Sequence, residues 1–368
     1  MIRLAIPSID AQEEKAVAAV FKSGFLVQGK TVAQFEEKLA HYLNVEYAIA
    51  VNSGTSALHL ALLAHGIGPG DEVIIPDYTF PATANVVELV GAKPVIVDID
   101  PVTFNIDPAL IQQLITRKTK AIMPVHLFGQ SADLDPIMQI AKKHKLTVIE
   151  DAACVLGARY KGRKCGTIGD IGCFSFHPRK VITTAEGGII VTNKRSVADQ
   201  LRILRNHGIA YKNNKIDFVM PGFNYRMTEM QAAIGLVQMK KLEALIRARR
   251  KVANMYDAQL ASIGWIKTPV TPSYNTHVFQ SYIIQIPQRI NRDQFINYLR
   301  QNGIEANFGT YALHKITFYK NKYRLRVLQF PITEHAFQTS VALPLFEHLS
   351  ANQIQKIVGT IRKFQYKV

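Results

Sequence analysis

Between residues 46 and 150 the chain alternates short apolar runs with segments whose apolar residues recur at helical spacing. Runs that are apolar on both faces and joined by helices are typical of a mostly parallel sheet between helices. Strands are predicted at 47–51, 72–76, 94–98, 121–125, 147–150, 172–176 and 188–192. Helices are predicted between the first five of them, at 56–64, 83–90, 108–116 and 134–143. The sequence therefore predicts an α/β fold.

A smaller α/β unit is predicted to follow a long helix at residues 228–260. The pattern after this helix reads strand, helix, strand and final helix, at 279–286, 292–301, 303–307 and 351–363. With 368 residues the chain is long enough for two domains. We expect a large domain at 1–245, whose N-terminal segment can pack on the small domain, and a small C-terminal domain at 246–368. A cleft between packed domains is the usual place for a ligand.

The net charge of +16 comes from 44 Lys and Arg against 28 Asp and Glu. A basic balance is compatible with nucleic acid, a membrane surface or a small anionic ligand. The basic residues are dispersed, and the cluster at 247–251 lies on the predicted long helix, where a charged stripe is usually a solvated face. No segment interleaves a basic face with aromatic residues, so we expect no nucleic-acid partner. The charge fits a phosphorylated ligand.

No apolar run approaches the ~18 residues that a membrane helix needs, so no membrane partner is expected. The N-terminus reaches a proline and acidic residues before a signal-peptide core could form. The three cysteines, Cys154, Cys165 and Cys173, cannot all pair and have no metal-ligand spacing. We expect a protein of the reducing cytoplasm with no bound metal.

Residues 52–58, Asn-Ser-Gly-Thr-Ser-Ala-Leu, follow a predicted strand and open a helix. Glycine permits a tight turn, and the free N–H groups of the first helical turn can hold a phosphate. The alternative is an ordinary helix cap, because Ser and Thr cap helices in any protein. The segment matches neither the G-x-G-x-x-G fingerprint nor the P-loop, so it does not indicate NAD or ATP.

Asp151 follows the strand at 147–150, at the edge where open α/β sheets bind ligands. It is a candidate metal ligand, base or partner of a protonated ring nitrogen, with a helix N-cap as the structural alternative. Lys180 lies between a later strand end and a glycine pair, where it can form a Schiff base with a carbonyl cofactor. An aspartate, a lysine and a phosphate-type helix start are together the parts that a pyridoxal 5'-phosphate (PLP) site requires.

Short motifs recur in order along the chain: GKTVAQFE (29–36), NSGTSAL (52–58), YTFPATAN (78–85), PVHLFGQ (124–130), EDAA (150–153), FSFHPRK (174–180), EGG (186–188), NYRM (224–227) and QAAIGL (231–236). Each is weakly specific alone. In this order, and nearly end to end, they resemble the DegT-type sugar aminotransferase family of fold type I PLP enzymes. The resemblance implies a large domain with a mostly parallel central sheet between helices and a smaller C-terminal α/β domain.

The resemblance also implies residue roles. Lys180 should carry PLP as a Schiff base and serve as general acid–base, and Asp151 should pair with the pyridine nitrogen. Phe80 should stack on the ring, although without the family it would be interpreted as a core residue. Asn224 should reach the phosphate bound by the neighbouring subunit, which implies a homodimer with active sites at its interface. Without the family, Asn224 belongs to a turn before the long helix.

Further cofactor and substrate contacts are implied by position. Those expected at the cofactor phosphate are Gly54, Thr55, Ser56 and Ser175. Those expected at the substrate are Lys30, His177, Arg226 and His314, with a structural role beside Pro178 as the alternative for His177. Many relatives carry glutamine where this chain has Cys154. A thiol is a poor hydrogen-bonding group, so Cys154 is a secondary cofactor contact.

The implied reaction is PLP-dependent transamination of a nucleotide-linked keto-sugar, with L-glutamate as amino donor. The amino-sugar nucleotide would serve surface glycan biosynthesis, such as that of lipopolysaccharide O-antigen. A 4-keto-6-deoxy sugar is the expected acceptor and a 3-keto sugar the close alternative. Relatives that have histidine in place of the lysine carry out dehydration, whereas this chain keeps Lys180. A non-catalytic ligand sensor is the remaining alternative, and the intact Lys180 and Asp151 argue against it.

Overall fold

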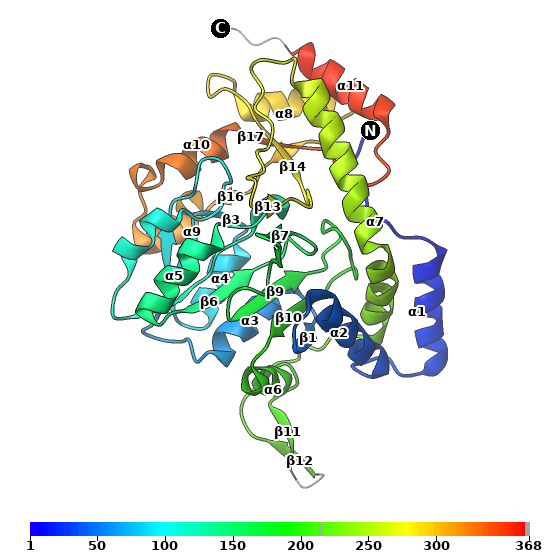
Figure 1. Cartoon of the computed structure of the whole chain (residues 1–368), viewed down its shortest axis with the longest axis vertical. Coiled ribbons are helices and arrows are strands. Elements are labelled where there is room, and N and C mark those ends of the chain that lie inside the picture. The colour runs from blue at the N-terminus through cyan, green and yellow to red at the C-terminus, as the bar shows by residue number, and fades with distance from the viewer. Residues whose placement is uncertain (213–214, 365–368) are drawn as a thin grey trace.

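The computed structural model describes residues 1–212 and 215–364 (Figure 1). The helices are α1 (Ala11–Ser23), α2 (Lys30–Leu43), α3 (Gly54–Ala64), α4 (Ala82–Leu89), α5 (Leu134–His144), α6 (Arg195–Leu204), α7 (Glu229–Leu260), α8 (Arg292–Gln301), α9 (Thr317–Tyr323), α10 (Pro331–Thr339) and α11 (Ala351–Arg362). Single 3₁₀ turns are η1 (Pro108–Leu110), η2 (Gln112–Leu114), η3 (Leu127–Gly129), η4 (Leu313–Lys315) and η5 (Val327–Gln329).

The strands of the large sheet are β1 (Tyr47–Val51), β2 (Glu72–Pro76), β4 (Lys93–Val97), β5 (Thr119–Ile122), β6 (Thr147–Asp151), β9 (Ile171–Ser175) and β10 (Gly188–Thr192). The other strands are β3 (Tyr78–Thr79), β7 (Arg159–Tyr160), β8 (Arg163–Lys164), β11 (Ile209–Lys212), β12 (Lys215–Phe218), β13 (Asn275–Thr276), β14 (Tyr282–Gln285), β15 (Asn307–Phe308), β16 (Tyr311–Ala312) and β17 (Ser340–Leu343).

The large sheet has the order β1-β10-β9-β6-β5-β2-β4. Strand β10 runs antiparallel to both of its neighbours, and the other pairs in the sheet are parallel. Because successive strand residues point to opposite faces, Ala50 belongs to the core cluster that includes residues of α2 and α5. Ile49 and Val51 belong to the cluster that includes residues of α3, α4 and α6. This is the predicted mostly parallel sheet between helices.

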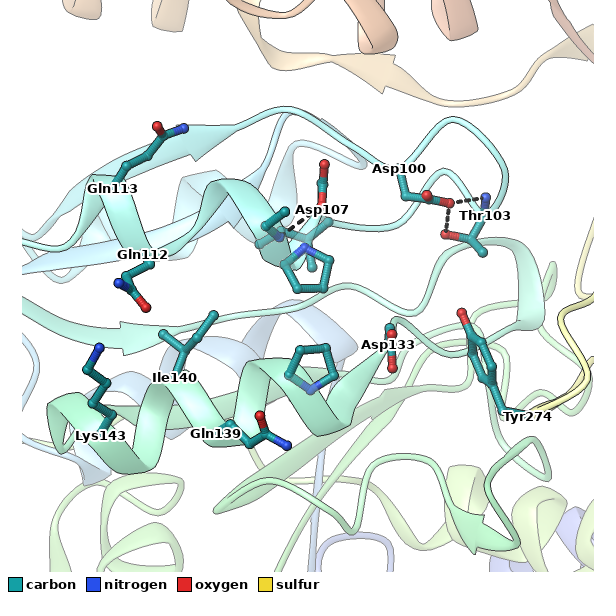
Figure 2. Close-up of a pocket in the computed structure, with 14 residues that line it drawn as sticks. Asp100, Thr103, Asp107, Gln112, Gln113, Asp133, Gln139, Ile140, Lys143 and Tyr274 are labelled. Atoms are coloured by element: carbon teal, nitrogen blue, oxygen red, sulfur yellow. Dashed lines mark hydrogen bonds between the residues drawn. The ribbon is translucent and has the colours of Figure 1, made fainter.

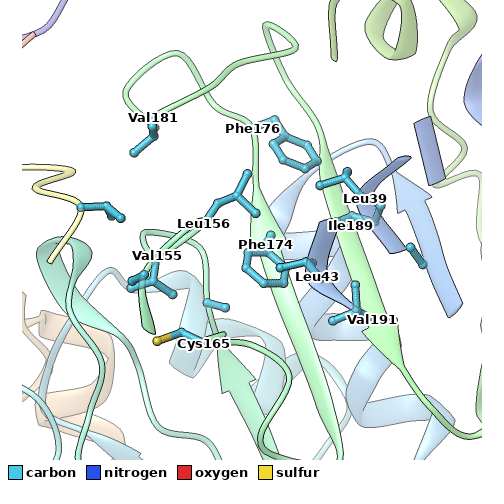
Figure 3. Close-up of a cluster of buried hydrophobic side chains, with 14 of the residues drawn as sticks. Leu39, Leu43, Val155, Leu156, Cys165, Phe174, Phe176, Val181, Ile189 and Val191 are labelled. Atoms are coloured by element: carbon cyan, nitrogen blue, oxygen red, sulfur yellow. The ribbon is translucent and has the colours of Figure 1, made fainter. Parts of the chain in front are cut away.

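Aromatic side chains fill the core where β9 meets α2. Figure 3 shows Phe174 and Phe176 beside Leu39 and Leu43 of α2 and the aliphatic residues of β10. Both phenylalanines are almost fully buried, and Phe176 packs edge-on against Phe35 with ring centroids 5.3 Å apart. This packing fixes the end of β9, from which the chain continues to Lys180.

A second core forms around the antiparallel sheet β14-β17-β15 and helices α8 and α11. Helix α7 contributes to both cores, since Leu242 and Ile246 pack beneath the large sheet and Tyr256 and Leu260 pack in the second core. Ile2 also packs in the second core and bridges Ile304. We propose that the two cores are the two expected domains, joined within α7.

Two element predictions are wrong in detail. The segment 108–116 forms the turns η1 and η2 instead of a helix. Short helices gain little from propagation alone, so local packing, here of Ile111 in the core, decides the conformation. The strand expected at 303–307 is reduced to β15, because Ile304 pairs with Ile2 of the N-terminal segment. Strand β17, at the centre of the small sheet, was not predicted.

Within the described residues, no helix combines the length and apolar character that a membrane span requires. Cys154 is half-buried and Cys165 and Cys173 are buried, and none of the three forms a disulfide.

Candidate active site

The start of α3 lies against the end of β9. A Cβ added to Gly54 would lie 2.8 Å from Cβ of Ser175, so only glycine permits this approach. Gly188 allows a similarly close approach, since its Cβ would lie 2.4 Å from the carbonyl oxygen of Ser53. The structure thus brings the helix start and Ser175 together, as a phosphate cradle requires.

Within this helix start the serines serve as caps. Ser53 is the N-cap, and its hydroxyl accepts from the backbone N–H of Ser56 at 3.0 Å. The hydroxyl of Ser56 donates to Oδ1 of Asn52 at 2.6 Å. Ser56 is therefore held within the cap, while Thr55 is exposed and Ser175 is half-buried. The capping alternative concerns the serine hydroxyls, whereas the phosphate prediction concerns free backbone N–H groups of the same turn. The two interpretations therefore do not exclude each other.

Asp151 ends β6, and its carboxylate is almost fully buried. The hydroxyl of Thr83 donates to its Oδ2 at 2.8 Å, and the backbone N–H of Ala153 donates to Oδ1 at 3.3 Å. Burial raises the pKa of Asp151, while these hydrogen bonds and the charge of Lys180 lower it. Thr83 lies in the motif at 78–85, but no role was predicted for it.

Lys180 follows β9 and is half-buried. Its Nζ lies 3.1 Å from Sγ of Cys154, and its charge acts on Asp151. Three residues that are separate in the sequence therefore meet at the carboxyl ends of β6 and β9. The amine of Lys180 is therefore hydrogen-bonded to a thiol and lies near a buried carboxylate. This is the geometry of a nucleophilic amine site.

Phe80 is 62% exposed and follows strand β3. Its ring meets Tyr311 edge-on with centroids 6.0 Å apart. The alternative of a core phenylalanine is wrong, because the side chain faces solvent. An exposed aromatic ring three residues before Thr83, which holds Asp151, is available to cover a flat ligand.

The remaining expected contacts lie on other segments of the chain. Asn224 is exposed, and its backbone oxygen lies 3.5 Å from Nδ2 of Asn52. Arg226 donates to Oδ1 of Asn206 at 2.6 Å and bridges Val51 through its backbone. The other two are Lys30, exposed at the first position of α2, and His177, half-buried with a pKa lowered by burial.

His314 differs from the expectation of a substrate contact. It is 1% exposed, and its Nδ1 bonds Oδ2 of Asp77 at 2.5 Å while Nε2 bonds Oε2 of Glu334 at 3.0 Å. Both ring nitrogens are occupied within the fold, so the geometry favours a structural role. Sequence separation conceals these partners, because Asp77 lies 237 positions earlier.

A groove of about 970 Å³ lies elsewhere, between η1, η2 and α5 (Figure 2). Neither Lys180 nor Asp151 lines it. Its carboxylates serve the fold: Asp100 accepts from Thr103, Asp107 caps η1 and Asp133 accepts from Tyr160. Among the described residues, no three His, Cys, Asp or Glu side chains are arranged to hold a metal ion.

The residues at the ends of β6 and β9 fit PLP. In the expected phosphate cradle, Gly54 lies so close to Ser175 that position 54 has no room for a larger side chain. The buried Asp151 requires a cationic partner to remain ionised, which a protonated pyridine nitrogen provides. Lys180 supplies the amine for a Schiff base, and Phe80 an open aromatic face. Fold and site together define a PLP-dependent enzyme of fold type I.

Comparison with known proteins supports this class of enzyme. A model of the DegT/DnrJ/EryC1/StrS aminotransferase family matches residues 7–362, and the chain belongs to this family. It is 42% identical to GDP-perosamine synthase of Caulobacter vibrioides, over 98% of this chain and 97% of that protein. It is 37% identical to UDP-4-amino-4-deoxy-L-arabinose–oxoglutarate aminotransferase of Shewanella sediminis, over 96% of both.

Among solved structures, Helicobacter pylori PseC, an aminotransferase involved in the biosynthesis of pseudoaminic acid, superposes with a TM-score of 0.93. The two chains are 30% identical, and 98% of each is covered. The protein is therefore a PLP-dependent aminotransferase.

Proposed function

We propose that this aminotransferase converts a nucleotide-linked keto-sugar into an amino-sugar, with a 4-keto-6-deoxy sugar as acceptor and L-glutamate as donor. The observation that carries the catalytic part is the meeting of Lys180, Asp151 and the α3 start at one sheet edge. The names of two relatives, each containing a nucleotide and an amino-sugar, support the acceptor class.

One of those names specifies a 4-amino sugar and oxoglutarate, the keto acid that remains when glutamate has given up its amino group. It supports amination at the 4-position and glutamate as donor. The sugar's diphosphate is doubly anionic, and Arg226 and Lys30 are the basic side chains that we propose for it.

Bound PLP supplies the electron sink for both halves of a transamination. With PLP bound, Asp151 would hold the proton on the pyridine nitrogen, Ser175 and the first N–H groups of α3 would bind the phosphate, and Phe80 would cover the ring. Lys180 Nζ removes the proton from Cα of glutamate and later delivers a proton to the former keto carbon of the sugar.

We propose in addition that the active form is a homodimer. Large apolar side chains are exposed on two segments, at Phe25 (77%), Val27 (55%), Tyr211 (75%) and Phe218 (67%). We propose that a partner subunit covers these side chains. Asn224 is exposed as well, as a side chain that reaches a partner's phosphate must be.

The first test is visible absorption of the PLP-loaded protein before and after addition of glutamate. We expect wild type to show a visible cofactor band that glutamate bleaches, and Lys180→Ala to show neither the lysine-dependent band nor turnover. Lys22→Ala, an exposed lysine in the last turn of α1, is the matched control and should behave as wild type.

The glutamate-treated protein is then mixed with 4-keto and 3-keto sugar nucleotides. Return of the visible band with the 4-keto compound alone supports the proposal, whereas return with the 3-keto compound alone refutes the assigned position. A wild-type band that glutamate leaves unchanged would refute glutamate as donor. If no amino acid bleaches it, the ligand-sensor alternative is favoured.

A further inference from the structure

Two buried threonines link Asp151 to the strand that precedes Phe80. The hydroxyl of Thr83, in the first turn of α4, donates to Oδ2 of Asp151 at 2.8 Å. The hydroxyl of Thr79, on β3, lies 3.0 Å from that of Thr83. Both threonines are at most 1% exposed, so water does not compete for these bonds.

Which hydroxyl donates in each of these two hydrogen bonds follows from the number of protons available. A threonine hydroxyl has one proton to donate, and the carboxylate of Asp151 can only accept when it is ionised. The proton of Thr83 is therefore used on Asp151, and Thr79 must donate to the oxygen of Thr83. A hydroxyl that accepts one hydrogen bond becomes a stronger donor in the next.

The hydroxyl of Thr83 is important to Asp151 because Asp151 is buried. Burial raises the pKa of Asp151, and the hydrogen bond from Thr83 is the largest of the influences that lower it, ahead of the charges of Lys180 and His126. The hydrogen bonds from Thr83 and from the backbone N–H of Ala153 also fix the rotation of the Asp151 carboxylate, because turning it would leave both donors unpaired.

We propose that Thr83 is a positioning residue that keeps Asp151 ionised and aimed at the cofactor nitrogen, and that Thr79 orients Thr83. The proposal rests on the proposed role of Asp151. Since Thr79 and Phe80 are adjacent, one short segment positions both the partner of the ring nitrogen and the aromatic cover of the ring. Strand β3 is held in turn by its antiparallel pairing with β16.

The test compares PLP affinity and the visible spectrum in Thr83→Val, Thr83→Ser and Thr79→Val. Loss of a hydrogen bond to a charged group predicts PLP binding about tenfold weaker in Thr83→Val. A shift of the bound cofactor's absorption should accompany it, because the protonation of the ring nitrogen changes. Thr83→Ser keeps the hydroxyl and should restore both, while Thr79→Val should show a smaller loss.

Thr333→Val is the matched control. Thr333 is fully buried and donates to Oδ1 of Asp98 at 2.7 Å, the same kind of bond away from the site. Thermal unfolding of the PLP-free proteins should show both valine variants folded and similarly destabilised. Between Thr83→Val and Thr333→Val, only Thr83→Val should change PLP affinity and the spectrum; an equal change in Thr333→Val would overturn the proposal.

The variant Asp151→Asn distinguishes the proposed role of Thr83 from the proposed role of Asp151 on which it rests. If Asp151→Asn leaves PLP binding and the spectrum unchanged, the role of Asp151 itself is wrong. If Asp151→Asn weakens binding and Thr83→Val does not, only the positioning role is refuted. In the double variant, Thr83→Val should add little to Asp151→Asn, because both changes act on one interaction.

Discussion

The contact between Gly54 and Ser175 shows how much a single atom decides at the residue scale. A hydrogen in place of a Cβ lets α3 begin against the end of β9, and the phosphate cradle depends on this approach. The motif at 52–58 predicted the helix start but not the strand end that faces it, because that strand lies more than a hundred residues later.

Gly54→Ala is therefore expected to weaken PLP binding and to destabilise the protein by about 1–3 kcal/mol through overpacking against Ser175. Gly359→Ala is the matched control, since Gly359 is in α11 and an added Cβ there meets nothing within 4 Å. That change should be neutral or stabilise by up to about 1 kcal/mol. PLP titration and urea unfolding of both variants check the prediction, which fails if they behave alike.

At the scale of elements, a buried charge network fastens the C-terminal part of the chain to the edge of the large sheet. Asp77 follows β2, His314 lies in η4 and Glu334 in α10, and Lys315 also pairs with Glu334 at 2.7 Å. The network holds β16 beside β3, the strand that leads to Phe80. His314 thus supports the site through these strands.

This network predicts a pH-dependent stability. Burial alone would lower the pKa of His314, but the carboxylates of Asp77 and Glu334 raise it above its ordinary value. A raised pKa in the folded state means that the stabilisation is fully present below about pH 6.5, the unfolded value, and is lost as the pH rises through the folded value.

His314→Gln should cost about 3 kcal/mol at pH 6, since it leaves the buried carboxylate of Asp77 without its cationic partner, whereas Glu334 keeps Lys315. Urea unfolding of wild type and variant at pH 6 and pH 9 measures this difference, which should shrink at the higher pH. A difference that is independent of pH would show that folding does not raise the pKa of His314.

On the scale of the whole molecule, we expect each active site to take Lys180 and Asp151 from one subunit and Asn224 from its partner. Lys180→Ala and Asn224→Ala should each be poorly active alone. Co-expressed, they form hybrid dimers in which one of two sites is intact, so random pairing should restore about a quarter of wild-type activity.

Lys180→Ala with Asp151→Asn is the control pair for this experiment. Both changes fall on the same side of the proposed interface, so every site of the hybrid contains one of them and no activity should return. Recovery in neither mixture, with dimers present by light scattering, would contradict a site shared between subunits.

The order of the large-sheet strands along the chain was predictable from the sequence because hydrophobic periodicity is local. Strands β1, β2 and β10 and helix α8 have the predicted bounds, and α7 begins one residue later, behind its N-cap Thr228. The order of motifs likewise predicted the family, and with it PLP and aminotransferase chemistry.

Only the tertiary structure decided which side chains meet. The hydrogen-bonded residues Thr83 and Asp151 are 68 positions apart in the sequence, and His314 and Asp77 are 237 positions apart. Phe80 is exposed instead of packed in the core. Periodicity specifies which face of an element is buried, not what lies opposite that face. The partners of a buried polar group follow from the packing of elements distant in sequence, and this is why local patterns predicted the fold and the structure assigned the contacts.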